Sequence, residues 1–175
     1  MTPRRGSERD HVDRFLDEIR AELPADLDFE VEGIVDRING INGRIRKLLD
    51  ETLEQYDLAS GDWKVLCSLR WKGRPHRRSA GELARIADLS SGAMTNRLDQ
   101  LEQAGLVKRL PNPDDRRGVL VELTPKGRRL HQEAIGVQAE KEAMLAEALT
   151  NREKTQLNDL LRRVMLVLEE RVPKW

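Results

Sequence analysis

The chain has 175 residues, of which 38% are hydrophobic, 3% aromatic and 35% charged, and its 31 basic and 31 acidic residues balance. This apolar content is low for a large solitary core, so we expect one domain with helical extensions that share a core with a partner chain. No apolar run reaches the length of a membrane span and no apolar signal segment follows the start, so we expect a cytoplasmic protein. The single cysteine, Cys67, excludes an intramolecular disulfide.

The first third of the chain is predicted to form two helices. An apolar stripe from Val12 to Leu23 predicts a short amphipathic helix that ends near Pro24, and a stripe from Ile34 to Leu49 predicts a longer one. The longer segment also contains three glycines, each costing up to about 1 kcal/mol relative to alanine in a helix: Gly33, Gly40 and Gly43. They either permit close helix approach or leave the helix flexible or kinked.

A third helix is expected from Ser60, which can cap it, and a basic loop follows at residues 71–78. The arginines of this loop either contact phosphates or are simply solvated, and both interpretations stay open: Arg74, Arg77 and Arg78.

Two short helices are predicted next. Ser79 and Glu82 form a capping box that opens the first, and Ser90 caps the second after a turn at residues 88–89. In the second helix three apolar residues recur at helical spacing: Met94, Leu98 and Leu101. Polar residues lie among them, and Gly105 ends the helix.

A hairpin and two more helices complete the chain. Residues 119–123 alternate as a half-buried strand does, and the turn before them carries two arginines at its tip. Thr124 caps a long helix with Pro125 at its first position. A capping box at residues 150–153 opens a final helix with an apolar stripe from Leu157 to Leu168.

A helix with short polar side chains, followed by a hairpin with a basic tip, is how a winged helix-turn-helix reads DNA. The charge distribution fits this interpretation. Residues 1–58 hold 9 basic and 15 acidic groups, whereas residues 70–118 hold 11 basic and 6 acidic groups. A localised basic face is the electrostatic footprint that DNA requires, even where the whole chain is neutral.

The stretch from Ser90 to Gly127 resembles the multiple antibiotic resistance regulator (MarR) family of bacterial transcription factors. The family's wing signature, D-x-R followed by a strand and L-T-x-x-G, matches residues 115–117 and 123–127. Its recognition-helix pattern matches residues 91–102. The resemblance implies a mainly α fold with a small β-hairpin wing: a winged helix-turn-helix with N- and C-terminal dimerisation helices. We expect dimerisation helices at 1–59 and 125–175 and the DNA-binding unit at 60–124.

The DNA-binding residues that we expect lie at the start of the helix-turn-helix, on the recognition helix and on the wing: Ser79, Ser90, Ser91, Gly92, Ala93, Thr95, Asn96, Arg97, Lys108, Asp115, Arg116 and Arg117. Arg97 has a second interpretation, as a structural partner that points back toward the wing. Lys108 and Arg109 are expected to add phosphate contacts. The alternative to DNA contact is an ordinary solvated helix face and a polar hairpin turn.

The family resemblance also implies a small-molecule pocket between the dimer helices and the winged unit. The expected ligand-binding residues are Ile38, Asn42, Arg46, Trp63 and Lys64. A tryptophan in this position is more often simply part of the core. A branch of the family that senses urate carries a tryptophan and an acid where this chain has Ile19 and Lys64. This departure argues against a urate-type site and leaves a small aromatic carboxylate as the expected effector.

No group of residues in the sequence indicates redox, metal-binding or catalytic chemistry. Cys67 is interpreted as a small buried hydrophobe, with a redox switch as the alternative. The three histidines have no metal-ligand spacing, and we expect them on the surface: His11, His76 and His131. No catalytic constellation, cofactor or metal site is expected. We therefore predict a homodimeric repressor on a pseudo-palindromic double-stranded DNA operator, with a protein-interaction module as the alternative.

Overall fold

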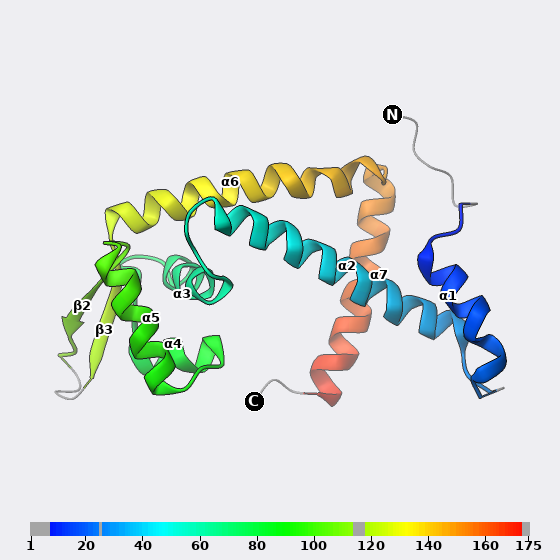
Figure 1. Ribbon diagram of the computed structural model, residues 1–175, viewed down its shortest axis with the longest axis horizontal. Helices are drawn as coiled ribbons and strands as arrows, with labels where there is room; N and C mark the ends of the chain where they lie inside the picture. The colour runs from blue at the N-terminus through cyan, green and yellow to red at the C-terminus, as the bar shows by residue number, and fades with distance from the viewer. Residues whose placement is uncertain (1–7, 25, 114–117, 173–175) are drawn as a thin grey trace. The chain divides into compact units, whose positions relative to one another are not determined.

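The computed structural model describes residues 8–24, 26–113 and 118–172. Figure 1 shows a mainly helical chain with one small antiparallel sheet, as predicted from the sequence. In chain order the elements are α1 (His11–Ile19), a 3-10 turn η1 (Arg20–Glu22), α2 (Phe29–Glu54), α3 (Ser60–Trp71), β1 (Arg77–Ser79), α4 (Ala80–Ala87), α5 (Ser91–Gln103), β2 (Val107–Pro111), β3 (Val119–Leu123), α6 (Pro125–Glu147) and α7 (Asn151–Arg171). Across the described residues, no helix is long and apolar enough to span a membrane.

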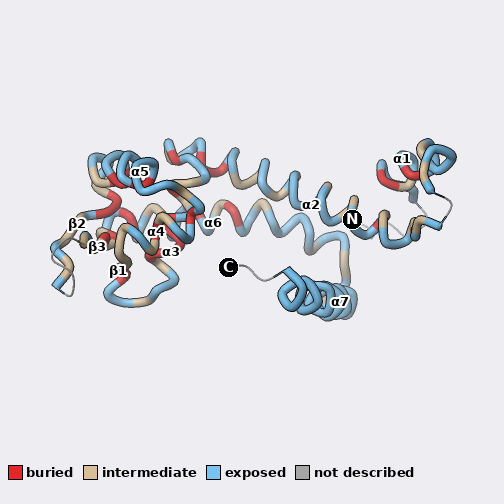
Figure 2. Tube along the Cα trace, turned by 90° about the horizontal axis from the view of Figure 1, so that it is seen from below, coloured by how far each residue is buried: buried red, intermediate tan, exposed pale blue. Residues whose placement is uncertain are grey.

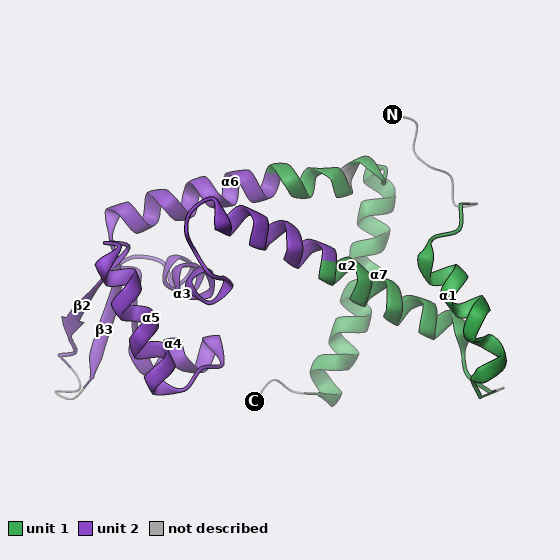
Figure 3. Cartoon of the chain, viewed as in Figure 1, with its two compact units in different colours: residues 1–43, 140–175 green, residues 44–139 purple. Residues whose placement is uncertain are grey.

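The chain forms two compact units (Figure 3). One comprises residues 1–43 and 140–175, and the other comprises residues 44–139. The divisions fall inside α2 and α6, so each of these long helices belongs to both units. The winged segment, with α3 to β3, lies wholly in the second unit.

The second unit has its own hydrophobic core, which Figure 2 shows as buried positions along α3, α4, α5 and the sheet. The side chains come from the apolar positions that recur at helical spacing and from alternate positions of β3. Those exposed by 2% or less include Leu53, Leu66, Leu69, Leu83, Met94, Leu98, Val121 and Leu123. Burial of each side chain of this size contributes about 1.5–3 kcal/mol to the stability of the folded state. This burial holds the helix-turn-helix against the sheet.

The sheet has three antiparallel strands in the order β1-β3-β2. The hairpin of β2 and β3 is the one predicted, with Leu110 opposite Leu120. Strand β1 was not predicted, and it pairs Arg77 with Glu122 on the other edge of β3. Three residues, two of them arginines, carry no alternation of apolar and polar side chains. Pairing with β3 therefore sets this strand, and local propensity does not.

Most of the predicted helix caps are confirmed. The capping boxes at Ser79 and Thr150 form, and the Thr124 hydroxyl accepts a hydrogen bond from the Gly127 amide at 3.0 Å. The expected cap at Ser60 is wrong. The helix begins one residue earlier than expected, after Ala59, whose amide donates to the Asp62 carboxylate at 2.8 Å. The Ser60 hydroxyl instead donates to Asp50 at 2.8 Å.

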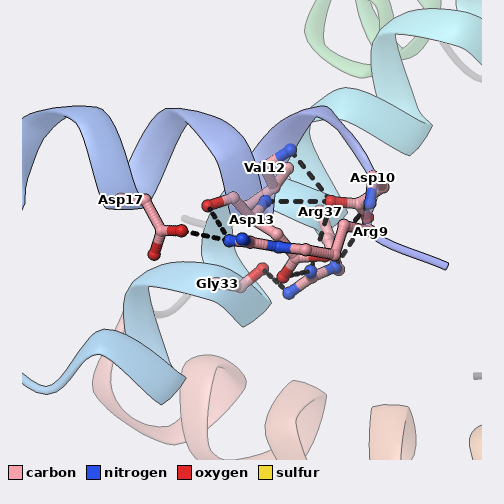
Figure 4. A network of polar contacts seen from close by, with 7 residues as sticks. All are labelled: Arg9, Asp10, Val12, Asp13, Asp17, Gly33 and Arg37. Carbon is pink, nitrogen blue, oxygen red and sulfur yellow. Dashed lines mark hydrogen bonds and ion pairs between the residues drawn. The ribbon is translucent and has the colours of Figure 1, made fainter. Parts of the chain in front are cut away.

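In the first unit, α1 packs on the N-terminal part of α2. Val12 and Leu16 are buried, and Arg37 of α2 binds two carboxylates at the start of α1 (Figure 4). Its Nε lies 2.9 Å from Asp10 Oδ2 and its Nη2 lies 2.5 Å from Asp13 Oδ1. Because Arg37 hydrogen-bonds the Asp10 carboxylate, the pKa of Asp10 falls to about 2.

Helix α2 is continuous through its glycines. Gly33 is buried, and a Cβ added there would lie 2.9 Å from Arg37 Nη1 and 3.7 Å from Leu16 Cδ1. Of the two interpretations of these glycines, close helix approach therefore holds at Gly33. At Gly43 an added Cβ would meet nothing within 4 Å.

Candidate nucleic-acid interface

Helix α5 presents two chemically different faces. Met94, Leu98 and Leu101 are buried against the core, whereas the opposite face at the N-terminal end is exposed. The exposed residues there are those that the sequence predicted for DNA contact: Ser90, Ser91, Gly92, Ala93, Thr95 and Asn96. Small side chains at the first turn leave the helix backbone open to close approach by a phosphate.

Two of these polar side chains already serve the helix. The Ser90 hydroxyl accepts from the Ala93 amide at 3.2 Å, and the Thr95 hydroxyl donates to the Ser91 carbonyl at 2.9 Å. Asn96 has no hydrogen-bond partner among the described residues, so its amide is free to pair with a base edge.

Arg97 is attached to a neighbouring helix. Its Nη1 lies 2.7 Å from Asp62 Oδ1 of α3, and the two side chains are 23% and 11% exposed. Gly61 makes room for it, since an added Cβ would lie 2.4 Å from the guanidinium carbon. Of the roles considered for Arg97, the structure places it as a structural partner of α3, not of the wing. Contact with DNA would require it to leave Asp62.

Arg109 also has a structural role. It joins β2 to the outer face of α5, with Nη1 at 2.7 Å from both Asp99 Oδ1 and Glu102 Oε2, and Nη2 donating to the Thr95 carbonyl at 3.2 Å. The Arg109 backbone amide and guanidinium hold the pKa of Glu102 below its usual value. Asp99 and Glu102, three residues apart on one face of α5, were the sequence signal that could have predicted these ion pairs with Arg109.

Two basic residues of the sheet bind the same carboxylate. Lys108 Nζ lies 2.8 Å from Glu122 Oε1, and Arg77 bonds the other oxygen of the same carboxylate. The hydrogen bond from Lys108, followed by that from Arg77, lowers the pKa of Glu122. Lys108 is half exposed and keeps access to a phosphate. Arg78 instead donates to the Ser68 carbonyl at 3.0 Å.

The Ser79 hydroxyl serves its capping box, accepting from the Glu82 amide at 3.2 Å. The predicted wing-tip residues Asp115, Arg116 and Arg117 lie outside the described residues.

The predicted ligand residues divide between the two units. Ile38 and Asn42 belong to the first unit and are exposed. In the second unit, Arg46 and Lys64 are exposed, and Trp63 stacks on His131 with ring centroids 4.8 Å apart and an interplanar angle of 17°. One face of the indole is therefore occupied by the protein itself.

The histidine prediction was wrong for two of the three residues. His11 is exposed, but His76 and His131 are 5% and 2% exposed. His131 is buried because it stacks on Trp63, and burial lowers its pKa. Cys67 is 4% exposed, and burial raises its pKa to about 12, so it behaves as a small hydrophobe and not as a thiolate.

Known proteins share this arrangement of a helix-turn-helix and a hairpin. A family model described as "MarR family" matches residues 58–119. The HTH-type transcriptional regulator PecS of Dickeya dadantii is 31% identical over 153 residues, or 87% of this chain and 92% of PecS. The multiple antibiotic resistance protein MarR of Escherichia coli is 35% identical over 144 residues, or 81% of this chain and 96% of MarR.

The chain belongs to the MarR family. A crystal structure of an E. coli MarR mutant complexed with operator DNA is 34% identical, with a TM-score of 0.61, and the match covers 80% of this chain and 99% of that one. This MarR-family chain therefore has the winged helix-turn-helix fold with terminal helices, and it is a DNA-binding transcriptional regulator. The family consists of regulators and not of enzymes.

Proposed function

We propose that this MarR-family regulator represses transcription by binding a pseudo-palindromic operator as a homodimer. The observation that carries the proposal is the exposed N-terminal face of α5, whose opposite face is fixed in the core next to the hairpin. A helix held in this way enters the major groove, and a hairpin beside it reaches the backbone or the minor groove.

The proposed base contact is Asn96, because asparagine pairs bidentately with adenine. Asn96→Ala is expected to relax base preference at one position, at a cost of about 1–3 kcal/mol against the preferred base. Fluorescence anisotropy with the upstream intergenic DNA and its single-base variants measures this loss. Gln103→Ala removes an exposed amide side chain from the other end of α5; it is the matched control and should bind as wild type. Equal affinity of Asn96→Ala for every sequence variant, at the wild-type value, would remove Asn96 from the interface.

The wing is proposed to contribute Arg117 through phosphates or the minor groove. Arg117→Ala should weaken operator binding, and the loss should shrink as salt rises because counterion release is part of the affinity. A loss that does not depend on salt would argue that Arg117 supports the hairpin instead.

The proposed dimer uses α2 and α7. Helix α7 has no buried residue, and its apolar stripe is exposed by 42–55% at Leu157, Leu160, Leu161, Val164 and Leu168. With Ile34 and Ile38 of α2 these residues line a groove of about 570 Å³. A second copy of the same helices would bury this face, and two reading heads would then bind two half-sites with high effective concentration.

Leu160→Glu should shift the protein toward monomers in analytical ultracentrifugation at micromolar concentration. Ile86→Glu changes a similarly exposed apolar residue on α4 and should leave the dimer intact. In the dimer, the two copies of α5 should meet half-sites about 34 Å, or roughly 10 base pairs, apart. A footprint of one half-site without symmetry would contradict the proposal.

The proposed effector is a small aromatic carboxylate near Trp63, Lys64 and Arg46. The two exposed cations favour an acid, and the Trp63–His131 stack gives an optical signal that a ligand would perturb. Such a ligand releases DNA only by binding the DNA-free conformation better than the bound one. Salicylate titrated against the protein–operator complex should change tryptophan fluorescence and lower operator affinity together. No change in either quantity at millimolar concentration would refute the effector and leave the DNA-binding proposal intact.

A further inference from the structure

A basic pocket of about 570 Å³ lies in the second unit, between the end of α3, the loop before β1 and the first turns of α6. Four of its lining residues are arginines, and one is an acid, Glu133: the arginines are Arg70, Arg74, Arg128 and Arg129. His76 and Gln132 add polar groups to the wall. The volume is within the range of small-molecule sites.

The positive charge of this pocket is not neutralised by the protein. Arg70, Arg74 and Arg129 have no ion-pair partner among the described residues, and the Arg128 Nη1 donates only to the Leu123 carbonyl, at 3.2 Å. By contrast, Arg97 and Arg109 elsewhere in the same unit each bind a carboxylate at 2.7 Å. Like charges held around one cavity repel one another, and an anion placed among them removes that repulsion.

His76 provides a second and independent indication. The residue lies in the pocket wall and is only 5% exposed, and its Nδ1 is buried without a hydrogen-bond partner among the described residues. The backbone of His76 is fixed beside the pocket: its amide donates to the Gly73 carbonyl at 2.6 Å, and its carbonyl accepts from the Leu123 amide at 3.2 Å. A buried polar atom without a partner is unfavourable, and a turn of the ring that brings Nδ1 to the pocket wall would let a ligand satisfy it.

The pocket lies away from the surface proposed to read DNA. Pro125, in its wall, follows the end of β3 that is remote from the hairpin turn (Figure 1). The Thr124 hydroxyl next to it donates to the Gly105 carbonyl at 2.7 Å, just beyond the C-terminal end of α5. The exposed first turn of α5 is at the other end of a 13-residue helix, about 20 Å away at 1.5 Å per residue. DNA phosphates at the reading face therefore do not explain these arginines.

We infer that this pocket binds a small organic anion with two or more negative charges, carried by phosphate or carboxylate groups. The guanidinium groups of Arg70, Arg74 and Arg129 match the forked geometry of such oxyanions. His76 Nδ1 supplies a hydrogen bond at the buried end. A monoanion would leave most of the cationic charge unmatched, so affinity is expected to rise with the charge of the ligand. The site is separate from the one proposed beside Trp63.

Inorganic pyrophosphate is the first probe, and citrate and acetate are the second and third. Isothermal titration calorimetry of the full chain, without DNA and at constant ionic strength, should show one saturable site per chain for pyrophosphate or citrate and none for acetate. The double variant Arg74→Gln/Arg129→Gln should weaken binding at least tenfold. The control, Arg14→Gln/Arg152→Gln, removes the same charge from exposed arginines of α1 and α7 and should bind as wild type.

His76→Gln tests the buried end of the site and should weaken binding several-fold, provided that circular dichroism shows a folded protein. Absence of saturable binding of both polyanions would overturn the inference. An equal loss in the Arg74/Arg129 variant and in its control would overturn it too, because it would show general charge attraction only. If the Arg74/Arg129 variant instead binds polyanions normally in the titration but loses affinity for all DNA sequences in a separate fluorescence anisotropy measurement, the arginines belong to a DNA-backbone surface and the inference is overturned. Because these titrations contain no DNA, their failure leaves the operator proposal untouched.

Discussion

Gly127→Ala should destabilise the winged unit far more than the loss or gain of one methyl group suggests. Gly127 is buried in the first turn of α6, where the helix crosses the start of β2. An alanine Cβ there would lie 2.1 Å from the Leu106 carbonyl oxygen and 2.9 Å from Leu123 Cδ1. The Leu106 oxygen cannot simply move, because it accepts hydrogen bonds from the Thr124 amide at 3.0 Å and from the Thr124 hydroxyl at 3.1 Å.

The expected cost follows from three contributions. Overpacking costs about 1–3 kcal/mol, and disturbing two hydrogen bonds costs about 0.5–1.5 kcal/mol each. Alanine returns up to about 1 kcal/mol through its higher helix propensity. The net loss is about 1–6 kcal/mol, or a fall in Tm of roughly 2–24 °C for a chain of this size.

Gly136→Ala is the matched control for this prediction. Gly136 lies on the same helix and is exposed, and an added Cβ would meet nothing within 4 Å. Only the propensity gain remains, so Tm should rise by about 2–4 °C. Both variants are measured by thermal unfolding at one fixed protein concentration. The steric argument is refuted if Gly127→Ala unfolds at or above the wild-type temperature.

Three further perturbations follow from contacts in the two units. Cys67 should resist thiol reagents until the chain unfolds. Its folded pKa of about 12 exceeds the ordinary 9.0, so the unfolded state releases the proton first and the free energy of unfolding should fall between about pH 9 and pH 12. The variant Cys67→Ala should abolish this pH dependence. Arg37→Ala should return the pKa of Asp10 from about 2 toward its ordinary 3.8 in an NMR titration, and it should speed amide exchange in α1. The stabilisation by this ion pair is present above pH 3.8 and is lost as pH falls through 2. It is below about 1 kcal/mol because both side chains are about two-fifths exposed. Asp62→Ala should cost about 1–3 kcal/mol in chemical denaturation, because it leaves Arg97 and the Ala59 amide unpaired, whereas an unchanged midpoint would show that water replaces the carboxylate.

The recognition helix and the hairpin could be predicted because their buried residues repeat at fixed spacing. Met94, Leu98 and Leu101 all face one core, and β3 alternates, so the pattern depends only on local geometry. The L-T-x-x-G motif is similar: Thr124 caps α6, and Gly127 allows the approach to β2. Each of these features is visible within about ten residues of sequence.

Features set by distant partners could not be predicted in this way. Strand β1 exists because β3 pairs with it, and His131 is buried because Trp63 lies against it. Arg109 resembles a phosphate contact in the sequence because Asp99 and Glu102 lie on another element, α5, and only the packing of α5 beside β2 brings them to it. A charge in the sequence does not reveal whether an acid of the same chain has already neutralised it.

The exposed stripe of α7 has a consequence for the lifetime of the protein in the cell. Most of the stability of a helix in a protein comes from packing of its apolar face, and α7 has no buried residue, so its capping box at Thr150 contributes little by itself. If a second copy provides its packing, the order of α7 depends on protomer concentration by mass action. Scarce protomers would then expose a frayed C-terminal segment to proteases, and abundant protomers would protect one another. Synthesis rate would in this way set the turnover of the regulator as well as the occupancy of its operator.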